Sequence, residues 1–314
     1  MEQEKKGKPL GMKIARAITD DGPKTVILYD SRYYDLSEIT GVDMENTGAS
    51  FFYIIQKNME KIREFLSQGK HASLQDIVPK SYLLPIPHVN QIRDFYAFED
   101  HVRNARARRG LEVPAEWYEF PAYYYSGNSS LYPSDCNIAR PSFTKELDFE
   151  LEIAAVIGKE GRNITKGDAW EHIFGFVLMN DWSARDQQRK EMAIGLGPSK
   201  SKDFATSFGR YLVTAEEAAS MVDNNGKLNS EVWVNLNGIE FMKNNLSTMH
   251  WTFSDLISWA STDVTLRPGD IIMSGTVGNG CILEHGPEKT GWLKPGDVVK
   301  FGSDFFGELA SNIV

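Results

Sequence analysis

Asp148-Phe149-Glu150-Leu151-Glu152-Ile153 is the stretch that decides the fold, and it lies in a run from residue 147 to 157 that is typical of a strand. Because residues two apart in a strand face the same side, Glu150 and Glu152 are predicted to point together, away from Phe149, Leu151 and Ile153. Two ionised carboxylates side by side repel each other, and burial increases the repulsion. The pattern fits either an amphipathic strand with a wet acidic face or two carboxylates that share a hard cation such as Mg²⁺, Mn²⁺ or Ca²⁺.

Two further acidic residues favour the cation. Asp181 follows an apolar strand candidate, residues 175–179, and begins a helix-like run, at the kind of strand end that commonly presents site residues. Asp94 lies in a segment rich in tyrosine and phenylalanine, with His101 a short distance further on. The chain has 6 histidines and no local Cys/His cluster, which argues against zinc as the ion.

Three other segments carry candidate site groups, each with a plain structural alternative. Arg185 and Gln188 share one face of a helix predicted over residues 182–192. Arg185 suits bidentate recognition of a carboxylate, or is a surface arginine at an ordinary helix start. Lys202 follows a loop that lacks the spacing of a phosphate-binding loop, and it is either a charge donor to an enolate or carboxylate or a solvated loop lysine. The glycine-rich residues 275–280 allow backbone to approach a ligand closely, or form a flexible β-loop.

The remaining pattern predicts an α+β fold that is mostly β. A strand pair over residues 12–18 and 25–29 and a helix over 51–66 form a small N-terminal α/β domain, residues 1–85, which ends near the proline-bearing connector 83–87. A larger catalytic domain, residues 86–314, follows. Asn237-Gly238 predicts a type I′ hairpin, and two Pro-Gly-Asp segments, 268–270 and 295–297, predict turns that lead into strands. Further helices are predicted over residues 166–173, 215–221 and 253–260.

Composition limits the classes of partner. The chain has 314 residues, 41% hydrophobic and 25% charged, with 34 basic and 43 acidic side chains and a net charge of −9. This balance argues against a nucleic-acid partner, although Arg103, Arg106, Arg108 and Arg109 form a local basic cluster, either a solvated helix face or an anion-catching lid. Two cysteines without CxxC spacing, no apolar run of membrane-spanning length and no apolar signal-peptide core predict a cytoplasmic protein with no membrane partner.

At these positions the sequence resembles the fumarylacetoacetate hydrolase family, in order, over roughly residues 85–314. The most specific segment is Met179-Asn180-Asp181-Trp182-Ser183-Ala184-Arg185-Asp186. The other matching segments are Asp94-Phe95-Tyr96 with His101, Asp148 to Glu152, Leu196-Gly197-Pro198 with Lys202, and Ser274-Gly275-Thr276 with Leu283-Glu284. The resemblance implies a β-roll or sandwich of mixed sheets after a small N-terminal domain, and a homodimer.

The resemblance also implies roles for individual residues. Asp94, Glu150, Glu152 and Asp181 match the family's ligands for a divalent cation, Mg²⁺ or alternatively Mn²⁺ or Ca²⁺. His101 matches the general base, and Glu284 the carboxylate that orients it. Arg185 and Lys202 match charged groups that line the site, and Tyr96, Tyr124, Gln188 and Thr276 match positions that touch the substrate. One difference is Met192, which stands where the family's hydrolase proper has a tyrosine.

These matches predict an enzyme that hydrolyses a carbon–carbon bond in a small anionic 1,3-diketo acid, of the fumarylacetoacetate or acylpyruvate type, as in aromatic amino acid catabolism. An alternative keeps the same cation site but decarboxylates a β-keto acid such as oxaloacetate, or interconverts the keto and enol forms of a dicarboxylate. A non-catalytic binding protein of the same fold is a third hypothesis.

Overall fold

The computed structural model describes residues 12–314. A mixed twelve-stranded sheet runs through it, in the order β3-β2-β1-β15-β12-β10-β19-β5-β6, with β4 on β1, β14 on β12 and β7 on β14. Its strands are β1 (Lys13–Thr19), β2 (Gly22–Tyr29), β3 (Arg32–Asp35), β4 (Ser81–Tyr82), β5 (Ile92–Phe95), β6 (Tyr123–Ser126), β7 (Leu131–Tyr132), β10 (Leu151–Ile157), β12 (Ile173–Asp181), β14 (Thr206–Phe208), β15 (Leu212–Thr214) and β19 (Ile271–Met273).

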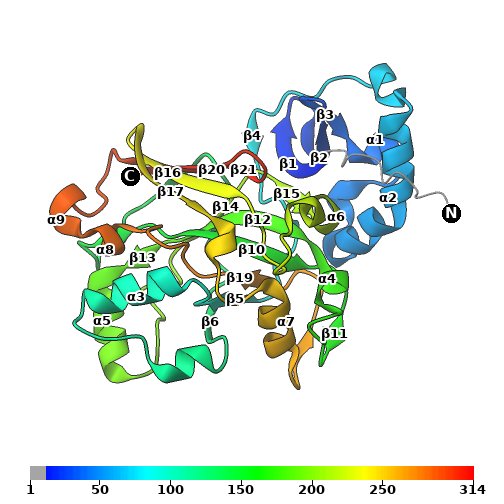
Figure 1. The fold of residues 1–314 in the computed structure, drawn as a ribbon. Coiled ribbons are helices and arrows are strands. Elements are labelled where there is room, and N and C mark those ends of the chain that lie inside the picture. The colour runs from blue at the N-terminus through cyan, green and yellow to red at the C-terminus, as the bar shows by residue number, and fades with distance from the viewer. Residues whose placement is uncertain (1–11) are drawn as a thin grey trace.

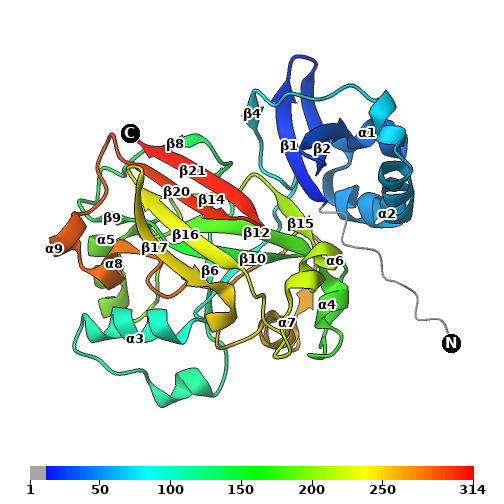
Figure 2. The same cartoon turned by 45° about the horizontal axis from the view of Figure 1, so that its top comes forward.

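A second sheet of five strands lies against the first (Figures 1 and 2). Its order is β17-β16-β20-β21-β8, from β8 (Cys136–Ile138), β16 (Glu231–Leu236), β17 (Ile239–Asn245), β20 (Val298–Ser303) and β21 (Gly307–Ile313). Two short ladders pair β9 (Leu147–Asp148) with β13 (Ser183–Ala184), and β11 (Gly161–Arg162) with β18 (Thr265–Leu266).

Helices surround the sheets. The α-helices are α1 (Leu36–Thr40), α2 (Phe51–Ser67), α3 (Glu99–Ala107), α4 (Ala169–His172), α5 (Arg185–Ile194), α6 (Ala215–Ala218), α7 (Phe253–Ser261), α8 (Ile282–His285) and α9 (Pro287–Thr290). Single 3₁₀ turns are η1 (Met44–Asn46), η2 (Gly48–Ser50), η3 (Lys70–Ser73), η4 (Ala115–Tyr118), η5 (Ala219–Met221) and η6 (Leu246–Thr248). None of the helices within residues 12–314 is long and apolar enough to cross a membrane.

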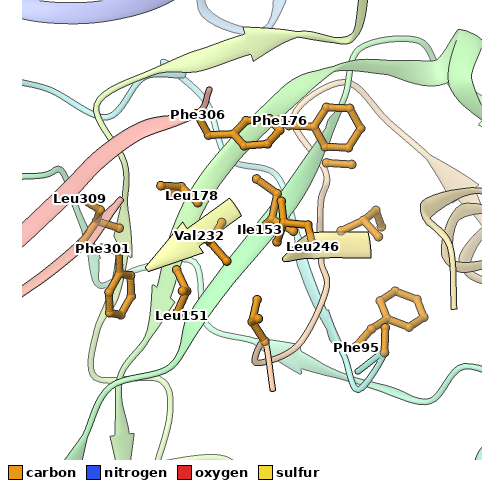
Figure 3. Close-up of a cluster of buried hydrophobic side chains, with 14 of the residues drawn as sticks. Phe95, Leu151, Ile153, Phe176, Leu178, Val232, Leu246, Phe301, Phe306 and Leu309 are labelled. Carbon is orange, nitrogen blue, oxygen red and sulfur yellow. The ribbon is translucent and has the colours of Figure 1, made fainter. Parts of the chain in front are cut away.

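The main hydrophobic core lies between the two sheets. Leu151 and Ile153 from β10 and Phe176 from β12 pack with Val232 and Phe301 from the five-stranded sheet (Figure 3). Phe149 belongs to the same cluster, whereas Glu150 and Glu152 reach a pocket instead. The predicted division of this segment into an apolar and an acidic face is therefore confirmed, and so is the α+β, mostly β fold class.

The hairpin turn predicted from Asn237-Gly238 was confirmed, whereas the predicted start of one helix was wrong. Asn237 and Gly238 have φ angles of 55° and 80°, as a type I′ turn requires, and they join β16 to β17. The helix predicted from residue 182 was wrong in its start: it begins at Arg185, because Ser183 and Ala184 pair as β13 with β9. Asp181 is the last residue of β12 rather than the start of a helix.

The N-terminal elements share a sheet and a core with the rest of the molecule. β1 pairs with β15, placing Ile14 opposite Leu212. A second hydrophobic cluster combines Phe51 and Phe52 of α2 with Phe174 of β12. Figures 1 and 2 show this blue segment at one end of the large sheet. The domain boundary between residues 85 and 86 stays a prediction.

Candidate active site

One pocket of about 490 Å³ gathers most of the predicted site residues. The predicted residues in its lining are Asp94, Tyr96, His101, Tyr124, Glu150, Glu152, Arg185, Gln188, Lys202 and Thr276. Asp181 and Glu284 do not line it, but each contacts a residue that does. Segments from residue 94 to residue 284 therefore meet at one place.

Three carboxylates converge beside this pocket from neighbouring parts of the large sheet. Asp94 lies on β5, Glu152 on β10 and Asp181 on β12, and one oxygen of each lies within 4.8 Å of the others. Asp94 Oδ1, Glu152 Oε1 and Asp181 Oδ1 are buried and have no hydrogen-bond partner among the described residues. Buried oxygens without partners carry a desolvation penalty, and this donor set fits a hard divalent cation.

The electrostatics of the three carboxylates lead to the same conclusion. Burial, followed by the charge of a neighbouring carboxylate, raises the pKa of Asp94 and of Glu152 well above the usual range. Burial also raises the pKa of Asp181, although Lys202 opposes the shift. Without a cation, burial and mutual repulsion favour the protonated forms, and a bound cation would add to the positive charge that Lys202 supplies to the group.

Glu150 has different partners from these three residues. Its Oε1 accepts a hydrogen bond from Arg185 Nη2 at 2.7 Å, and its Oε2 accepts one from Lys202 Nζ at 2.5 Å. Burial alone would raise the pKa of Glu150, but Arg185 and Lys202 outweigh burial and lower it. Lys202 also donates to Asp181 Oδ2, at 2.5 Å. The predicted role of Glu150 as a cation ligand stays a prediction.

Asp148 is a site residue that the sequence analysis missed. It accepts hydrogen bonds from Arg185 Nε at 2.9 Å and from the backbone N–H groups of Ile282 at 2.8 Å and Leu283 at 3.1 Å. Asp148 thus ties Arg185 to α8, the helix that carries Glu284. The signal was present, because Asp148 continues the two-residue period of Glu150 and Glu152.

His101 and Glu284 form a buried pair beside the pocket. His101 Nδ1 on α3 lies 2.8 Å from Glu284 Oε2 on α8. Glu284 Oε1 accepts hydrogen bonds from the Asn279 N–H and from Asn104 Nδ2, at 2.9 and 3.2 Å. Burial acts to raise the pKa of Glu284, but His101 and the Asn279 N–H lower it overall, so the group is held as a carboxylate. A carboxylate at Nδ1 orients the imidazole and leaves Nε2 as the acceptor.

Aromatic and glycine residues complete the wall. The Tyr124 hydroxyl donates to Asp181 Oδ2 at 2.6 Å, and the ring of Tyr96 lies edge-on to His101, with ring centroids 5.4 Å apart. Burial raises the pKa of Tyr96 to about 12, so its hydroxyl remains a donor at neutral pH. The Gly275 N–H donates to Glu152 Oε2 at 3.0 Å, and Gly275 has a φ of 78° at a place where a Cβ would collide with the Phe95 carbonyl group.

Arginine side chains form part of the rim of the pocket, and of these only Arg189 was not singled out from the sequence. Arg106, Arg108 and Arg109 of the basic cluster line it, as does Arg189, whereas Arg103 pairs with Glu99 and Asp100 on α3. Arginine at the rim favours an anionic ligand. Met192 lines the same pocket.

Comparison with known proteins identifies the family. The family model described as fumarylacetoacetate (FAA) hydrolase C-terminal matches residues 90–314. The chain belongs to the fumarylacetoacetate hydrolase family. The family resemblance predicted from the sequence is therefore confirmed.

Individual relatives have different named activities. The fumarylacetoacetase of Oryza sativa subsp. japonica is 31% identical over 282 residues, which cover 73% of this chain and 65% of the rice protein. Oxaloacetate tautomerase fahd2, mitochondrial, of Xenopus laevis is 32% identical over 267 residues, which cover 81% of this chain and 78% of that protein. This chain thus spans a larger share of the frog protein than of the rice protein.

A solved structure has the same fold. The crystal structure of fumarylpyruvate hydrolase from Pseudomonas aeruginosa in complex with Mn²⁺ and pyruvate matches with a TM-score of 0.57 and 24% identity. The match covers 72% of this chain and 90% of that one.

Proposed function

We propose that this protein is a divalent-cation-dependent hydrolase that cleaves a carbon–carbon bond in a small anionic 1,3-diketo acid of the acylpyruvate or fumarylacetoacetate type. The observation that carries the proposal is the buried His101–Glu284 pair, 2.8 Å apart, beside a pocket that also borders three carboxylates with unpartnered oxygens. Hydrolysis needs a base that activates water, and this pair supplies one. The Mn²⁺ and pyruvate in the Pseudomonas aeruginosa structure and the name of the rice relative support the same reaction class.

Asp94, Glu152 and Asp181 would hold the cation, with Glu150 as the fourth predicted ligand. Bound there, a divalent cation supplies Lewis acidity that polarises keto and enolate oxygens. His101, oriented through Nδ1 by Glu284, would accept a proton from water at Nε2 as the water oxygen attacks the distal carbonyl carbon. The bond between that carbon and the carbon that lies between the two carbonyl groups would then break, and His101 would return the proton to the carbon that leaves as an enolate.

Arg185 and Lys202 would stabilise the negative charge that develops on the substrate. Arg185 uses one N–H each for Asp148, Gln188 and Glu150, and a guanidinium has five. Lys202 uses two of its three N–H groups for Glu150 and Asp181. The Arg185 and Lys202 side chains therefore each keep N–H groups for a bound carboxylate or enolate oxygen, in a buried site where such interactions are strong.

A second candidate function is keto–enol tautomerisation of a small keto dicarboxylate, or decarboxylation of a β-keto acid, at the same cation site. The observation that favours it is the frog oxaloacetate tautomerase, 78% of which this chain matches. Tautomerisation moves one proton between carbon and oxygen and needs no water. The same His101–Glu284 pair would therefore only have to transfer a proton and would not have to activate water. Aromatic amino acid catabolism, Mg²⁺ as the physiological ion, the homodimer and the cytoplasmic location stay predictions.

Product analysis separates the candidates. The protein, freed of metal by chelation and reloaded with Mg²⁺ or Mn²⁺, is incubated with an acylpyruvate, with fumarylacetoacetate and with oxaloacetate. Hydrolysis yields two smaller acids, decarboxylation releases carbon dioxide, and tautomerisation changes the ultraviolet absorption while the mass stays constant. Turnover that persists under full chelation would contradict every one of these reactions.

The His101→Ala variant tests the base. It should lower turnover by about 10²- to 10⁴-fold, while the rise in thermal midpoint on adding Mn²⁺ stays as in the unmodified protein. His88→Ala is the matched control, because His88 is exposed and lies outside the pocket lining. Unchanged turnover in His101→Ala would remove the base from the mechanism.

A further inference from the structure

A second group of metal-ligating side chains lies next to the base, and it shares no residue with the three carboxylates. His101, Cys281 and Glu284 are all buried, and one ligand atom of each lies within 4.8 Å of the others. Cys281 immediately precedes α8, which carries Glu284, whereas His101 is on α3. The sequence shows no Cys/His cluster because these residues meet only in the folded chain.

We propose that His101, Cys281 and Glu284 form an inhibitory site for a thiophilic divalent cation such as Zn²⁺. Nitrogen, sulfur and carboxylate oxygen are the donors that Zn²⁺ takes in proteins, and they differ in kind from the all-oxygen group of Asp94, Glu152 and Asp181. The proposed site contains no ligand from that group, so the two sites would select different ions. The inhibition, though not the binding, rests on the proposed role of His101 as the base.

Glu284 Oε2 is the centre of this arrangement. It lies 2.8 Å from His101 Nδ1 and accepts from Cys281 Sγ at 3.3 Å, while the Asn279 and Asn104 N–H groups occupy Oε1. The two other ligand atoms thus lie close to the same oxygen. Tetrahedral zinc with its usual bond lengths separates such ligand atoms by roughly 3.3–3.6 Å, so each of the two distances from Glu284 Oε2 would have to change by about half an ångström or less.

Access and the fourth ligand come from the pocket. His101 and Leu283 both line it, so an ion reaches the group beside the imidazole, and water from the pocket would complete the tetrahedron. The metal–sulfur bond forms as the S–H bond breaks, and the thiol proton leaves to solvent. The metal–nitrogen bond forms at Nδ1, and the imidazole proton moves from Nδ1 to Nε2. One proton is therefore released for each ion bound.

This change of tautomer explains why the ion would inhibit. In the resting pair Nδ1 carries the proton and Nε2 is free to accept one. With a metal on Nδ1 the proton occupies Nε2, and His101 no longer accepts a proton from water. The carboxylate site would keep its own cation throughout, so excess Mg²⁺ or Mn²⁺ should not relieve the inhibition.

The experiment uses Co²⁺ as the probe, because thiolate ligation gives cobalt a charge-transfer absorption that oxygen ligands do not give. The chain has 2 cysteines, so replacing each of them in turn assigns the band to one cysteine. We expect it in the unmodified protein and in the control Cys136→Ser, and its loss in Cys281→Ser and in Cys281→Ala. It should persist in Asp94→Asn, which weakens the carboxylate site. A band that is absent from the unmodified protein, or that survives both Cys281 substitutions, would overturn the site.

Inhibition is then measured with Zn²⁺ in the presence of excess Mg²⁺, relative to the uninhibited rate of each variant. Cys281→Ser should need roughly tenfold more Zn²⁺ or above, the scale on which loss of a metal-site partner lowers affinity, whereas Cys136→Ser should match the unmodified protein. A cobalt–thiolate band without zinc inhibition would overturn the inhibitory role and would point to an error in the proposed base. If the unmodified protein turned over its substrate but showed no cobalt–thiolate band, the metal site would be overturned and the proposed function would stand.

Discussion

Glu150 and Glu152 are two residues apart, line the same pocket and are almost equally buried, at 4% and 1% exposure, yet their surroundings are opposite. Arg185 and Lys202 neutralise Glu150, and its pKa is lowered. Glu152 shares its surroundings with Asp94 and Asp181, and burial and these charges raise its pKa well above normal. The fold thus supplies two fixed positive charges to Glu150, and the proposed cation would supply the charge that Glu152 lacks.

The largest expected effect comes from removing a fixed charge on the Glu150 side. Arg185→Met leaves Asp148 without its charged partner and Glu150 with Lys202 alone, and breaking a buried pair in this way costs about 3–5 kcal/mol. Chemical denaturation should show that loss in the free energy of unfolding. Arg189→Met is the matched control, because Arg189 lies on the same helix and its pair with Glu146 is exposed, which limits the loss to about 1 kcal/mol. Equal losses in the two variants would contradict the assigned role of Arg185.

Neutralising each glutamate in turn should change stability in opposite directions. In chelator, Glu152→Gln removes a carboxyl whose ionisation is opposed by burial and by Asp94 and Asp181, and it offers an N–H₂ group to unpartnered oxygens, so the free energy of unfolding should rise by about 1–3 kcal/mol. Glu150→Gln turns an amide toward Arg185 or Lys202 and should lower it by a similar amount. Denaturation curves of both variants, with and without Mn²⁺, measure this, and only Glu152→Gln should lose most of the stabilisation by the cation. Changes of the same sign would remove the distinction between the two sides.

The smallest effect is a pH dependence of the stabilisation by the cation. A carboxyl whose pKa is raised in the folded state makes folding less favourable as pH rises from its unfolded pKa, about 4, toward the folded value. Asp94, Glu152 and Asp181 are of this kind, so the thermal midpoint in chelator should fall above about pH 4, and Mn²⁺ should raise it more at pH 8 than at pH 5. Glu150 is of the opposite kind, since its contribution is present above its unfolded pKa and lost only as pH falls below it. A stabilisation by Mn²⁺ that is constant between pH 5 and 8 would contradict the raised pKa values.

Periodicity and turn chemistry depend on short segments of the chain, so the features of the fold and the site that rest on them could be predicted from the sequence. The two-residue period of the Glu150–Glu152 segment predicted one acidic and one apolar face, and Asn237-Gly238 predicted its own turn. The start of α5 was missed because Ser183 and Ala184 pair with β9, from which more than thirty residues separate them, and tertiary pairing overrides local helical spacing.

Long-range contacts account for the other omissions. Nothing near Asp148 in the sequence indicates that the N–H groups of Ile282 and Leu283 will close on it. In the same way, His101 and Cys281 are 180 positions apart in the sequence, so no local spacing of cysteine and histidine indicates that they meet in the fold. The partners of Glu150 were missed because two acidic residues at strand spacing carry no information about which of them meets Arg185 and Lys202.

The pairing of β1 with β15 has a consequence for any attempt to isolate the region that matches the family model. A chain shortened to residues 90–314 would lose the strand that pairs with Val213 and Leu212, and it would uncover Phe174, which now packs against Phe51 and Phe52 of α2. β15 would stay paired with β12 on its other side, but an uncovered strand edge beside an exposed aromatic ring is a template for aggregation. The N-terminal segment is thus part of the condition for solubility of the catalytic region, and the truncated protein should precipitate where the full chain stays in solution.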